Sequence, residues 1–451
     1  MREFSSFRDP SGVVLRQDGF IIRQVNQCYQ AQYDQMMARL YAPLTKQGLL
    51  IAHEELDVPL QDKNAYRLIK PVQIPFISYP YEWSFGQLKD AALTTLHIHR
   101  AALEQDMILK DASAYNIQFL NGRPILIDTL SFDFYQQGSP WPAYGQFTRH
   151  FLAPLMLMAY RDIRLNQLLR VYIDGIPLDL ASTLLKGKGG FAASQHIHWH
   201  AKSTLKHGQD GKGEVRKIAI SKFSHMALID SLIRIVQKLS LKGVVTEWGD
   251  YYAHTNYSDA AAKAKEMLVA SYLDAVSPRT TWDMGANDGR YSRLALGRGG
   301  SVVAFDVDPI AVERSYHAVK ASGEAMLPLV LDLTNPSPAM GFANRERVGI
   351  HDRQKPDCLM MLAVIHHMVI SNNLPMPMLA DWLASLAGHL IIEFVPKEDS
   401  QVQTLLATRD DIFPDYTKEG FEKAFSGWFD ILRSERVEGS QRTLYLMRAK
   451  A

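Results

Sequence analysis

Short apolar runs alternate with amphipathic stretches through the second half of the chain. Runs of β-prone residues predict buried strands at residues 280–282, 301–305, 327–331, 357–363 and 390–392. Apolar residues at helical spacing separate them, at residues 258–275, 291–296 and 310–321. Strands that alternate with helices predict a parallel sheet covered by helices, an α/β architecture. Two last runs, at residues 428–436 and 443–447, flank a Glu438-Gly439-Ser440 turn and predict an antiparallel pair that ends a seven-stranded sheet.

The first part of the chain has a different pattern, with hairpins and longer helices. Apolar runs at residues 13–15 and 20–22 flank Asp18-Gly19, a dipeptide typical of a tight hairpin turn. Helical spacing is present over residues 29–40 and 88–103, and a strand is expected over residues 70–79. A second hairpin is predicted around Asn121-Gly122. We therefore expect an α+β domain over residues 1–185.

Residues 186–244 differ in composition from both flanking parts. Residues 186–243 hold eleven Lys or Arg against three Asp or Glu. Such an excess either attracts a phosphate-rich partner or belongs to a solvated linker, and the linker is the simpler interpretation. Residues 226–239 predict a helix that ends before Gly243. His196, His198 and His200 alternate with other residues, so a strand would place all three on one face. That face is either a metal site or an ordinary surface of the strand. The last domain then covers residues 245–451.

The chemistry of this last domain centres on the turn after its first strand. There Asp283 is followed by Gly285, Asn287 and Gly289, and a helix start comes next. Glycines let the backbone turn sharply and approach a ligand closely. The second strand ends on Asp306, and a carboxylate at that place can accept hydrogen bonds from both hydroxyls of a ribose. Because Asn287 takes the place of the middle glycine, the loop is not that of a dinucleotide-binding protein.

These residues resemble the first motifs of the class I S-adenosylmethionine-dependent methyltransferases, which have a Rossmann-like sheet with an antiparallel last pair. The segments DMGANDGR, AFDVDP, LDLTNPSP, LAVIHH and IIEFVPKED look like a subgroup related to nodulation host-specificity methyltransferases. The resemblance implies S-adenosylmethionine as cofactor, with these residues in its binding site: Asp283, Gly285, Asn287, Gly289, Asp306 and Asp332. The cofactor carries an ammonium and a sulfonium but no pyrophosphate, which explains an acid at Asp283.

Two adjacent histidines follow the fourth predicted strand. Ligands bind at the carboxyl ends of the strands in open α/β sheets, so His366 and His367 are candidates for a catalytic base. A neutral histidine can take a proton from a hydroxyl acceptor near physiological pH. Both can equally be structural residues of a helix cap, and Glu393 is the alternative base. An Asn-Pro-Pro-Tyr motif for amide or adenine-N6 acceptors is absent from the sequence, so we expect an oxygen or nitrogen of a small molecule, sugar or glycan as acceptor.

The first domain carries a second chemical pattern. Asp111 is followed five residues later by Asn116, then by the Asn121-Gly122 hairpin, whose second strand ends on Asp128. This pattern resembles the catalytic segment of protein kinases and aminoglycoside phosphotransferases. The resemblance implies a kinase-like fold, with Asp111 as the base, Asn116 and Asp128 as magnesium ligands, and ATP as the nucleotide.

The usual companions of that segment are missing. No glycine-rich phosphate loop precedes it, Lys110 stands where arginine is usual, and Arg23 is the nearest candidate for the phosphate-binding cation. We therefore expect a kinase-like fold with little or no phosphotransfer. The alternatives are a bifunctional methyltransferase–kinase of surface polysaccharide, a scaffold domain that only binds a nucleotide, partner or acceptor, and an ordinary hairpin without a ligand.

Composition narrows the setting of the protein. Of 451 residues, 47% are hydrophobic and 22% charged, and a net charge of +1 gives no general attraction to nucleic acids or anionic membranes. Two cysteines far apart in sequence, Cys28 and Cys358, suit a reducing compartment. No apolar stretch reaches the length of a membrane span, and the first residues lack the apolar run of a signal peptide. We expect a cytoplasmic protein.

Overall fold

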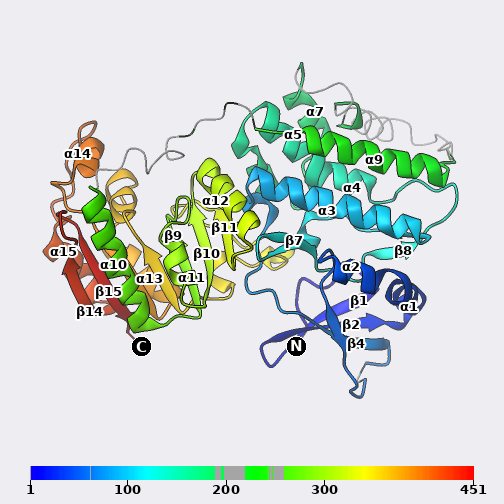
Figure 1. The fold of residues 1–451 in the computed structure, drawn as a ribbon, viewed down its shortest axis with the longest axis horizontal. Helices are drawn as coiled ribbons and strands as arrows, with labels where there is room; N and C mark the ends of the chain where they lie inside the picture. The colour runs from blue at the N-terminus through cyan, green and yellow to red at the C-terminus, as the bar shows by residue number, and fades with distance from the viewer. Residues whose placement is uncertain are drawn as a thin grey trace. The chain divides into compact units, whose positions relative to one another are not determined.

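The chain forms two compact units in the computed structural model, which describes residues 2–60, 62–187, 194–197, 219–241, 243, 246 and 258–450. The N-terminal unit comprises Met1–Val244 together with Ala339–Arg347, and the C-terminal unit comprises Val245–Pro338 and Val348–Ala451. Most of the basic stretch, including His198 and His200, lies outside the described residues. Each unit has its own sheet, and Figure 1 shows the elements of both.

The N-terminal unit begins with an antiparallel sheet in the order β1-β2-β4-β3. Its strands are β1 (Gly12–Gln17), β2 (Phe20–Asn26), β3 (His53–Glu55) and β4 (Ala65–Pro71). The predicted turn at Asp18-Gly19 is confirmed, since both residues have the positive φ that a tight hairpin turn requires (50° and 82°). Helices α1 (Gln30–Met36) and α2 (Ala42–Lys46) connect β2 to β3.

One predicted strand of this unit is wrong. We expected a strand over residues 70–79, whereas β4 ends at Pro71 and the chain continues without regular structure to a short 3₁₀ turn, Pro80–Glu82. Pro71 and Pro75 lack the N–H group that a strand needs for its ladder. The alternation of apolar residues in this stretch therefore reflects packing of an irregular segment, not pairing.

Helices follow the sheet in the N-terminal unit. The longest of those in the described residues is α3 (Phe85–Glu104), which begins with a capping box, because the Ser84 side chain accepts from the Gln87 N–H while the Gln87 side chain accepts from the Ser84 N–H. Helix α9 (Lys222–Lys238) runs beside α3, and Arg100 and Asp230 form an ion pair of 3.1 Å across them (Figure 1). The shorter helices are α4 (Tyr144–Phe147), α5 (Ala153–Tyr160), α6 (Leu168–Val171) and α7 (Leu178–Leu184).

Two small antiparallel pairs follow α3. Strand β5 (Met107–Leu109) pairs with β8 (Phe132–Phe134), and β6 (Ile117–Leu120) pairs with β7 (Arg123–Leu126). The β6–β7 pair is the hairpin predicted around Asn121-Gly122, and both turn residues have positive φ (49° and 73°). This nested arrangement brings the loop at Asp111–Asn116 next to the end of β7 and Asp128.

The C-terminal unit is built on a seven-stranded sheet in the order β11-β10-β9-β12-β13-β15-β14. Its strands are β9 (Thr280–Met284), β10 (Ser301–Asp306), β11 (Met326–Val330), β12 (Cys358–Met361), β13 (His389–Phe394), β14 (Phe429–Arg436) and β15 (Thr443–Ala449). The first five are parallel, and β15 is antiparallel to both β13 and β14. The predicted α/β sheet with an antiparallel last pair is confirmed.

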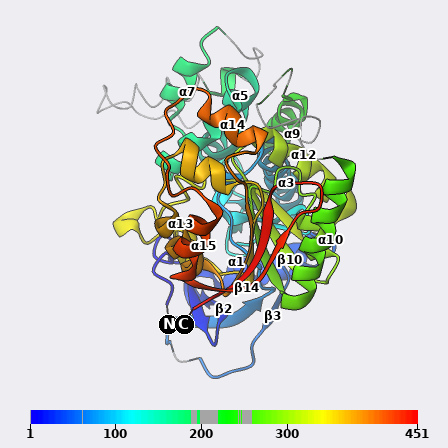
Figure 2. The same ribbon diagram turned by 90° about the vertical axis from the view of Figure 1, so that its left-hand side faces the viewer.

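Helices cover both faces of this sheet, because its parallel strands are buried on both sides. Figure 2 shows α10 (Asp259–Val276) on one face and α13 (Met376–Leu386) and α15 (Lys418–Ser426) on the opposite one. The remaining helices are α11 (Ser292–Leu296), α12 (Pro309–Ser322) and α14 (Ser400–Leu406). The strand order runs outward in opposite directions from β9 and β12, so a crevice opens at the carboxyl ends of these two strands.

One segment between β11 and β12 leaves the C-terminal unit. Residues Ala339–Arg347 belong to the N-terminal unit, although the residues on both sides of them belong to the C-terminal one. An antiparallel bridge between Met340 and Arg347 closes the segment into a loop. The sequence did not predict this excursion.

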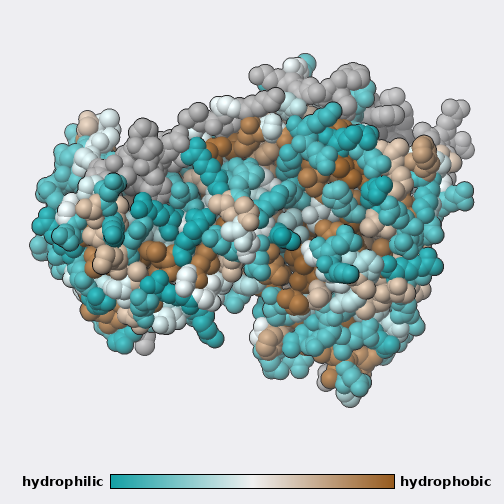
Figure 3. Space-filling view, in the orientation of Figure 1, coloured by the Kyte–Doolittle hydropathy of each residue, from teal (hydrophilic) through white to brown (hydrophobic). Residues whose placement is uncertain are grey.

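The surface agrees with the balanced composition. Hydrophilic residues dominate the face drawn in Figure 3, and hydrophobic residues form scattered patches on it. None of the helices in the described residues combines the length and the apolar character that a bilayer span requires.

Candidate active site

A cavity of about 370 Å³ opens at the carboxyl ends of β9, β10, β11 and β12 in the C-terminal unit. Its wall comes from the residues that follow these strands and from helix α10. Five of the six predicted cofactor residues line it: Asp283, Gly285, Asn287, Asp306 and Asp332. The sixth, Gly289, lies just beyond the lining at the end of the same loop.

The backbone of the loop after β9 explains its glycines. Gly285 has a φ of +89°, and a Cβ atom there would lie 2.2 Å from Cγ2 of Val364. Gly289 has a φ of +85° and would bring a Cβ to 2.9 Å from Cε of Met326. Asn287, at the middle position, has a φ of +51°, a conformation that asparagine tolerates better than most residues. The two glycines are therefore required by their positive φ and by the close packing of the loop against Val364 and Met326.

Asp283 is the buried acid of the cavity. Its Oδ2 accepts a hydrogen bond of 2.6 Å from the Ser292 hydroxyl, and 2% of the residue is exposed. Burial raises the pKa of Asp283 to about 7, with a further rise caused by Asp306. A carboxyl group of this kind gains from a cationic ligand, because a neighbouring positive charge favours its ionised form.

Asp306 ends β10 and is held by two backbone groups. Its Oδ2 accepts from the Asn287 N–H and its Oδ1 from the Asp308 N–H, each at 2.8 Å. Burial raises the pKa of Asp306 to about 6. Each carboxylate oxygen has two acceptor positions, so both oxygens can still accept from ligand hydroxyls.

Asp332 also lines the cavity and is exposed. Its Oδ1 accepts from the N–H of Thr334 at 2.8 Å and from the hydroxyl of Thr334 at 2.6 Å. These two bonds fix the carboxylate through Oδ1, and a carboxylate oxygen can accept further bonds from a donor such as an amino group.

The structure separates the two candidate histidines. His367 lines the cavity, whereas His366 is buried away from it with 2% of the residue exposed, and Nδ1 of His366 has no hydrogen-bond partner within the described residues. Burial lowers the pKa of both imidazoles. His367 is therefore neutral near pH 7 and can accept a proton from a group in the cavity.

Glu393, the alternative base, lies outside the lining and is fully buried. Its Oε2 accepts a hydrogen bond of 2.7 Å from Nζ of Lys265, which does line the cavity. The ammonium of Lys265 also lies 4.6 Å from the centre of the Tyr291 ring. Because the Glu393 carboxylate lies outside the lining and already accepts from Lys265, this position suits a base less than that of His367, which lines the cavity.

Sequence reasoning missed three residues of this site. Lys265 lies on the buried stripe of α10 with Ala261, Val269 and Leu273, and a lysine on an otherwise apolar stripe was the available signal. Ser292, which donates to Asp283, begins a short helix and had no signal of its own. Ala363 has a φ of +56° directly before Val364, an unfavourable conformation for alanine that only the structure reveals.

The residues present fit S-adenosylmethionine. Asp283 offers a buried anion to the ammonium, and Asp306 offers acceptors to ribose hydroxyls. Asp332 offers an acceptor to an adenine amino group. The site thus combines an anion for a cationic ligand with acceptors for its hydroxyl and amino groups.

The predicted residues of the N-terminal unit also meet in one cavity. Asp111, Asn116 and Asp128 all line a space of about 260 Å³, and the Asn116 amide and the Asp128 carboxylate both contact the Ser131 hydroxyl. Asp128 forms an ion pair with Arg23, and its Oδ1 accepts from the Leu130 N–H at 3.0 Å. Burial acts to raise the pKa of Asp128, but Arg23 and these hydrogen bonds outweigh it and leave the pKa below its ordinary value.

These contacts bear on a magnesium site. The guanidinium of Arg23 occupies the place at Asp128 that a cation would need, so the two ligands fit magnesium only if Arg23 moves away. In the part of the chain that the structure describes, no group of three or more His, Cys, Asp or Glu side chains could hold a metal ion. His196 lies in a helical turn at residues 194–197, not on a strand, and its Nδ1 is 2.5 Å from the Tyr144 hydroxyl.

Comparison with known proteins identifies a relative that spans the chain. The nodulation protein NoeA of Rhizobium meliloti (strain 1021) is 33% identical over 454 residues, which cover 98% of this chain and 95% of that protein. No protein-family model matches the chain.

Two solved methyltransferases align with a part of the chain at low similarity. The N-methyltransferase NodS of Bradyrhizobium japonicum WM9 aligns with 43% of this chain and 99% of its own, with a TM-score of 0.32 and 10% identity. The magnesium protoporphyrin IX methyltransferase ChlM of Synechocystis PCC 6803, solved with S-adenosylhomocysteine, aligns with 45% of this chain and 93% of its own, with a TM-score of 0.32 and 17% identity.

Proposed function

The chain belongs to the family of the nodulation protein NoeA, and we propose that it is an S-adenosylmethionine-dependent methyltransferase that acts on an oxygen or nitrogen of a small-molecule, sugar or glycan acceptor. The observation that carries the proposal is the cavity after β9, where a glycine turn lies between two buried acids, Asp283 and Asp306, with pKa values raised to about 7 and about 6. Buried acids favour a ligand with a positive charge and hydroxyl donors.

Each acid of the cavity has a separate role in this proposal. Asp283 pairs with the ammonium of the cofactor, Asp306 accepts from the ribose hydroxyls, and Asp332 accepts from the adenine amino group. S-adenosylmethionine supplies an electrophilic methyl group on its sulfonium. Binding of the cofactor and the acceptor in one cavity would hold the reacting groups in line, and such positioning accounts for much of the rate enhancement of a transfer between two bound molecules.

His367 removes the proton that the acceptor loses. It lines the cavity, and its lowered pKa keeps the imidazole neutral, the form that accepts a proton. His366 packs against it outside the cavity, with the two ring centres 4.2 Å apart. The acceptor is either an alcohol or an amine, since one neutral base serves both.

Binding of S-adenosylhomocysteine to the full chain tests the cofactor assignment. Asp306→Ala should weaken binding by roughly 1.5–3 kcal/mol, because it removes hydrogen bonds to a charged acceptor. Asp381→Ala, at an exposed position on α13, serves as the matched control and should bind like the unaltered chain. Calorimetry that finds equal affinity for both variants would refute the assignment.

We propose further that residues 1–185 form a kinase-like domain with little or no phosphotransfer. What supports this is the meeting of Asp111, Asn116 and Asp128 in one cavity, together with the nested β5–β8 and β6–β7 pairs that carry them. The ion pair between Arg23 and Asp128 favours a binding role over a catalytic one. The magnesium site at Asn116 and Asp128 stays a prediction, as does the bifunctional methyltransferase–kinase as the second candidate function.

A further inference from the structure

The cavity of the N-terminal unit is lined by several separate parts of the chain. Asp111 and Asn116 belong to its lining, one wall comes from the segment before β1, and another comes from Glu346 and Arg347 of the excursion between β11 and β12. The volume of about 260 Å³ is close to the lower end of ligand pockets, which span ~300–1,000 Å³.

Three buried polar atoms in this lining have no hydrogen-bond partner within the described residues, and one of them is Nε of Arg347. The Tyr115 hydroxyl and Nδ1 of His150 form no hydrogen bond within the described residues, and the two residues are 8% and 2% exposed. Burial, with Arg149 and Arg347 nearby, lowers the pKa of His150 to about 3, so its ring is neutral. Buried polar groups without protein partners are rare, so a molecule bound in this cavity would find hydrogen-bonding groups that the protein itself does not use.

The charges of the lining argue against an anionic ligand. Five carboxylates face three guanidinium groups in the lining, so acidic groups are in excess. Two of the guanidinium groups already have acidic partners, and Nε of the third, Arg347, has no partner within the described residues and can donate to a neutral oxygen. Arg8 binds Glu346 at 2.9 Å and Asp174 at 3.1 Å, and Arg23 binds Asp128. A phosphate would have to displace these carboxylates, whereas a neutral hydroxyl can donate to Asp111 and accept from Tyr115 at the same time.

Aromatic side chains continue the two walls onto the surface. Phe4, Phe7 and Phe342 are 37%, 46% and 68% exposed, and the rings of Phe4 and Phe342 are parallel within 1°, with centres 6.4 Å apart. Phe7 precedes the lining residue Arg8, and the Phe342 N–H donates to the lining residue Glu346 at 2.8 Å. The negative face of an aromatic ring attracts the polarised C–H bonds of a sugar ring.

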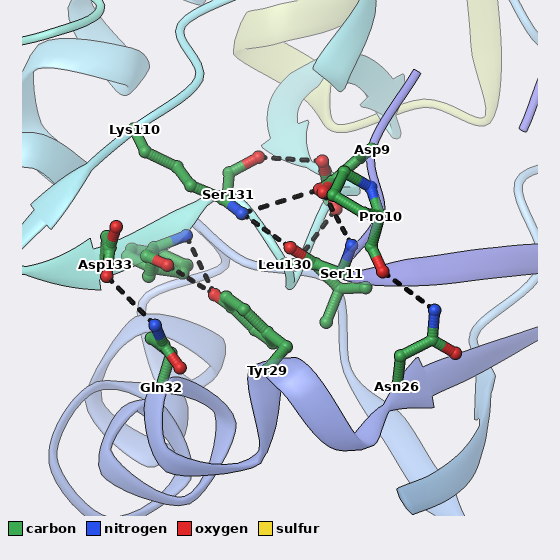
Figure 4. Close-up of polar contacts among 12 residues, drawn as sticks. Asp9, Pro10, Ser11, Asn26, Tyr29, Gln32, Lys110, Leu130, Ser131 and Asp133 are labelled. Carbon is green, nitrogen blue, oxygen red and sulfur yellow. Dashed lines mark hydrogen bonds and ion pairs between the residues drawn. The ribbon is translucent and has the colours of Figure 1, made fainter. Parts of the chain in front are cut away.

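The wall before β1 is held in place by Lys110. Its Nζ donates to the Ser11 hydroxyl at 2.8 Å, lies 3.6 Å from Asp9, and sits 4.7 Å from the centre of the Tyr29 ring, as Figure 4 shows for these residues. Asp9 in turn accepts from the Ser11 N–H at 2.8 Å. Lys110, which takes the place of an arginine before Asp111, therefore fixes one wall of the cavity through these contacts.

We propose that this cavity binds a neutral saccharide without a metal ion, with one sugar unit in the cavity and the next on Phe4, Phe7 and Phe342. Hydroxyls of the inner unit complete the hydrogen bonding of Tyr115 and His150 and donate to Asp111. The inference rests on the proposal that the N-terminal unit binds without phosphotransfer and is independent of methyl transfer by the C-terminal unit.

The test measures binding of neutral trisaccharides, namely maltotriose, cellotriose and triacetylchitotriose, to the full chain by calorimetry, with EDTA present and without S-adenosylmethionine. At least one of them should bind. Tyr115→Phe removes only the hydroxyl and should weaken binding about threefold to tenfold. Phe342→Ser should weaken it by a similar factor, whereas Phe223→Ser, at an 84% exposed position on α9, should leave it unchanged.

Three outcomes would overturn the inference. The first is that none of the trisaccharides binds at concentrations up to ~10 mM, which would leave only very weak affinity. The second is that a trisaccharide binds, but Tyr115→Phe and Phe342→Ser leave its affinity unaltered. The third is that inorganic phosphate, or ADP with Mg²⁺, binds and the sugars do not. ATP turnover by the same protein would contradict the proposed absence of phosphotransfer. It would not contradict a saccharide affinity measured in the binding experiment.

Discussion

A carboxyl group whose pKa lies near 7 makes ligand binding depend on pH. Asp283 is such a group, because burial raises its pKa to about 7, and only its ionised form can pair with the ammonium of the ligand. Below pH 7 the free protein holds a proton on Asp283 that binding must release. Affinity should therefore rise with pH up to about 7 and then level off.

Measured by calorimetry, S-adenosylhomocysteine should bind roughly tenfold more weakly at pH 6 than at pH 8, since about a tenth of a group with this pKa is ionised one unit below it. Asp283→Asn should bind more weakly at both values and lose most of the pH dependence. A flat profile for the unaltered chain would show that Asp283 does not pair with the ligand.

The two histidines should differ in their effects on turnover. His367→Ala should retain affinity for S-adenosylhomocysteine and lose about 10²–10⁴ in turnover, because it removes a base that lines the cavity. His366→Ala is the control, and the folded fraction of this variant should still transfer methyl groups. Measurement requires an acceptor and the release of S-adenosylhomocysteine. Equal turnover of His367→Ala and the unaltered chain would place the base elsewhere.

The buried ion pair of Lys265 and Glu393 should contribute to the stability of the fold more than to proton transfer. Glu393→Ala leaves the ammonium of Lys265 buried without its carboxylate, which should cost ~3–5 kcal/mol of the free energy of unfolding. Replacing both residues together, as Lys265→Met with Glu393→Leu, should recover much of that loss. Urea unfolding of the three proteins measures this. A double variant as unstable as Glu393→Ala would contradict the charge argument.

At the scale of elements, the turn after β9 requires glycine at residue 285 for two reasons, the lack of space for a Cβ atom and the positive φ of the backbone. Gly285→Ala should weaken S-adenosylhomocysteine binding more than tenfold, because its Cβ would lie 2.2 Å from Val364. Gly299 has a similar φ of +82° with open space around it, so Gly299→Ala tests the conformational strain alone and should leave binding intact. Equal binding losses in both variants would mean that strain, not the collision, decides the effect.

The elements of the C-terminal unit were predictable because local signals and the fold agree there. Strands such as β12 are apolar throughout, and Asp306 could be identified because it is the polar last residue of the apolar strand β10. Contacts between distant residues were not predictable. The pairing of Arg23 with Asp128 joins positions far apart in sequence, and Lys265 reaches the cavity from a helix that precedes the whole sheet. No periodicity in the sequence encodes which partner such a side chain meets.

At the scale of the whole molecule, the N-terminal unit should show no phosphotransfer. We expect ATP turnover by the full chain at the level of a buffer blank, with and without Mg²⁺, because Arg23 neutralises the carboxylate that a metal would need. Asp111→Asn should change nothing in this assay. Robust turnover that Asp111→Asn abolishes would instead establish the bifunctional enzyme.

The excursion Ala339–Arg347 has a consequence for how this protein is inherited. A gene cut once, between the codons of Val244 and Val245, separates Glu346 and Arg347 from the unit to which they belong. Either product would lack its full set of parts, since one loses a wall of its cavity and the other keeps a loop without its partner residues. We therefore expect selection against recombination between related genes at this point, and the two units should evolve together as one gene.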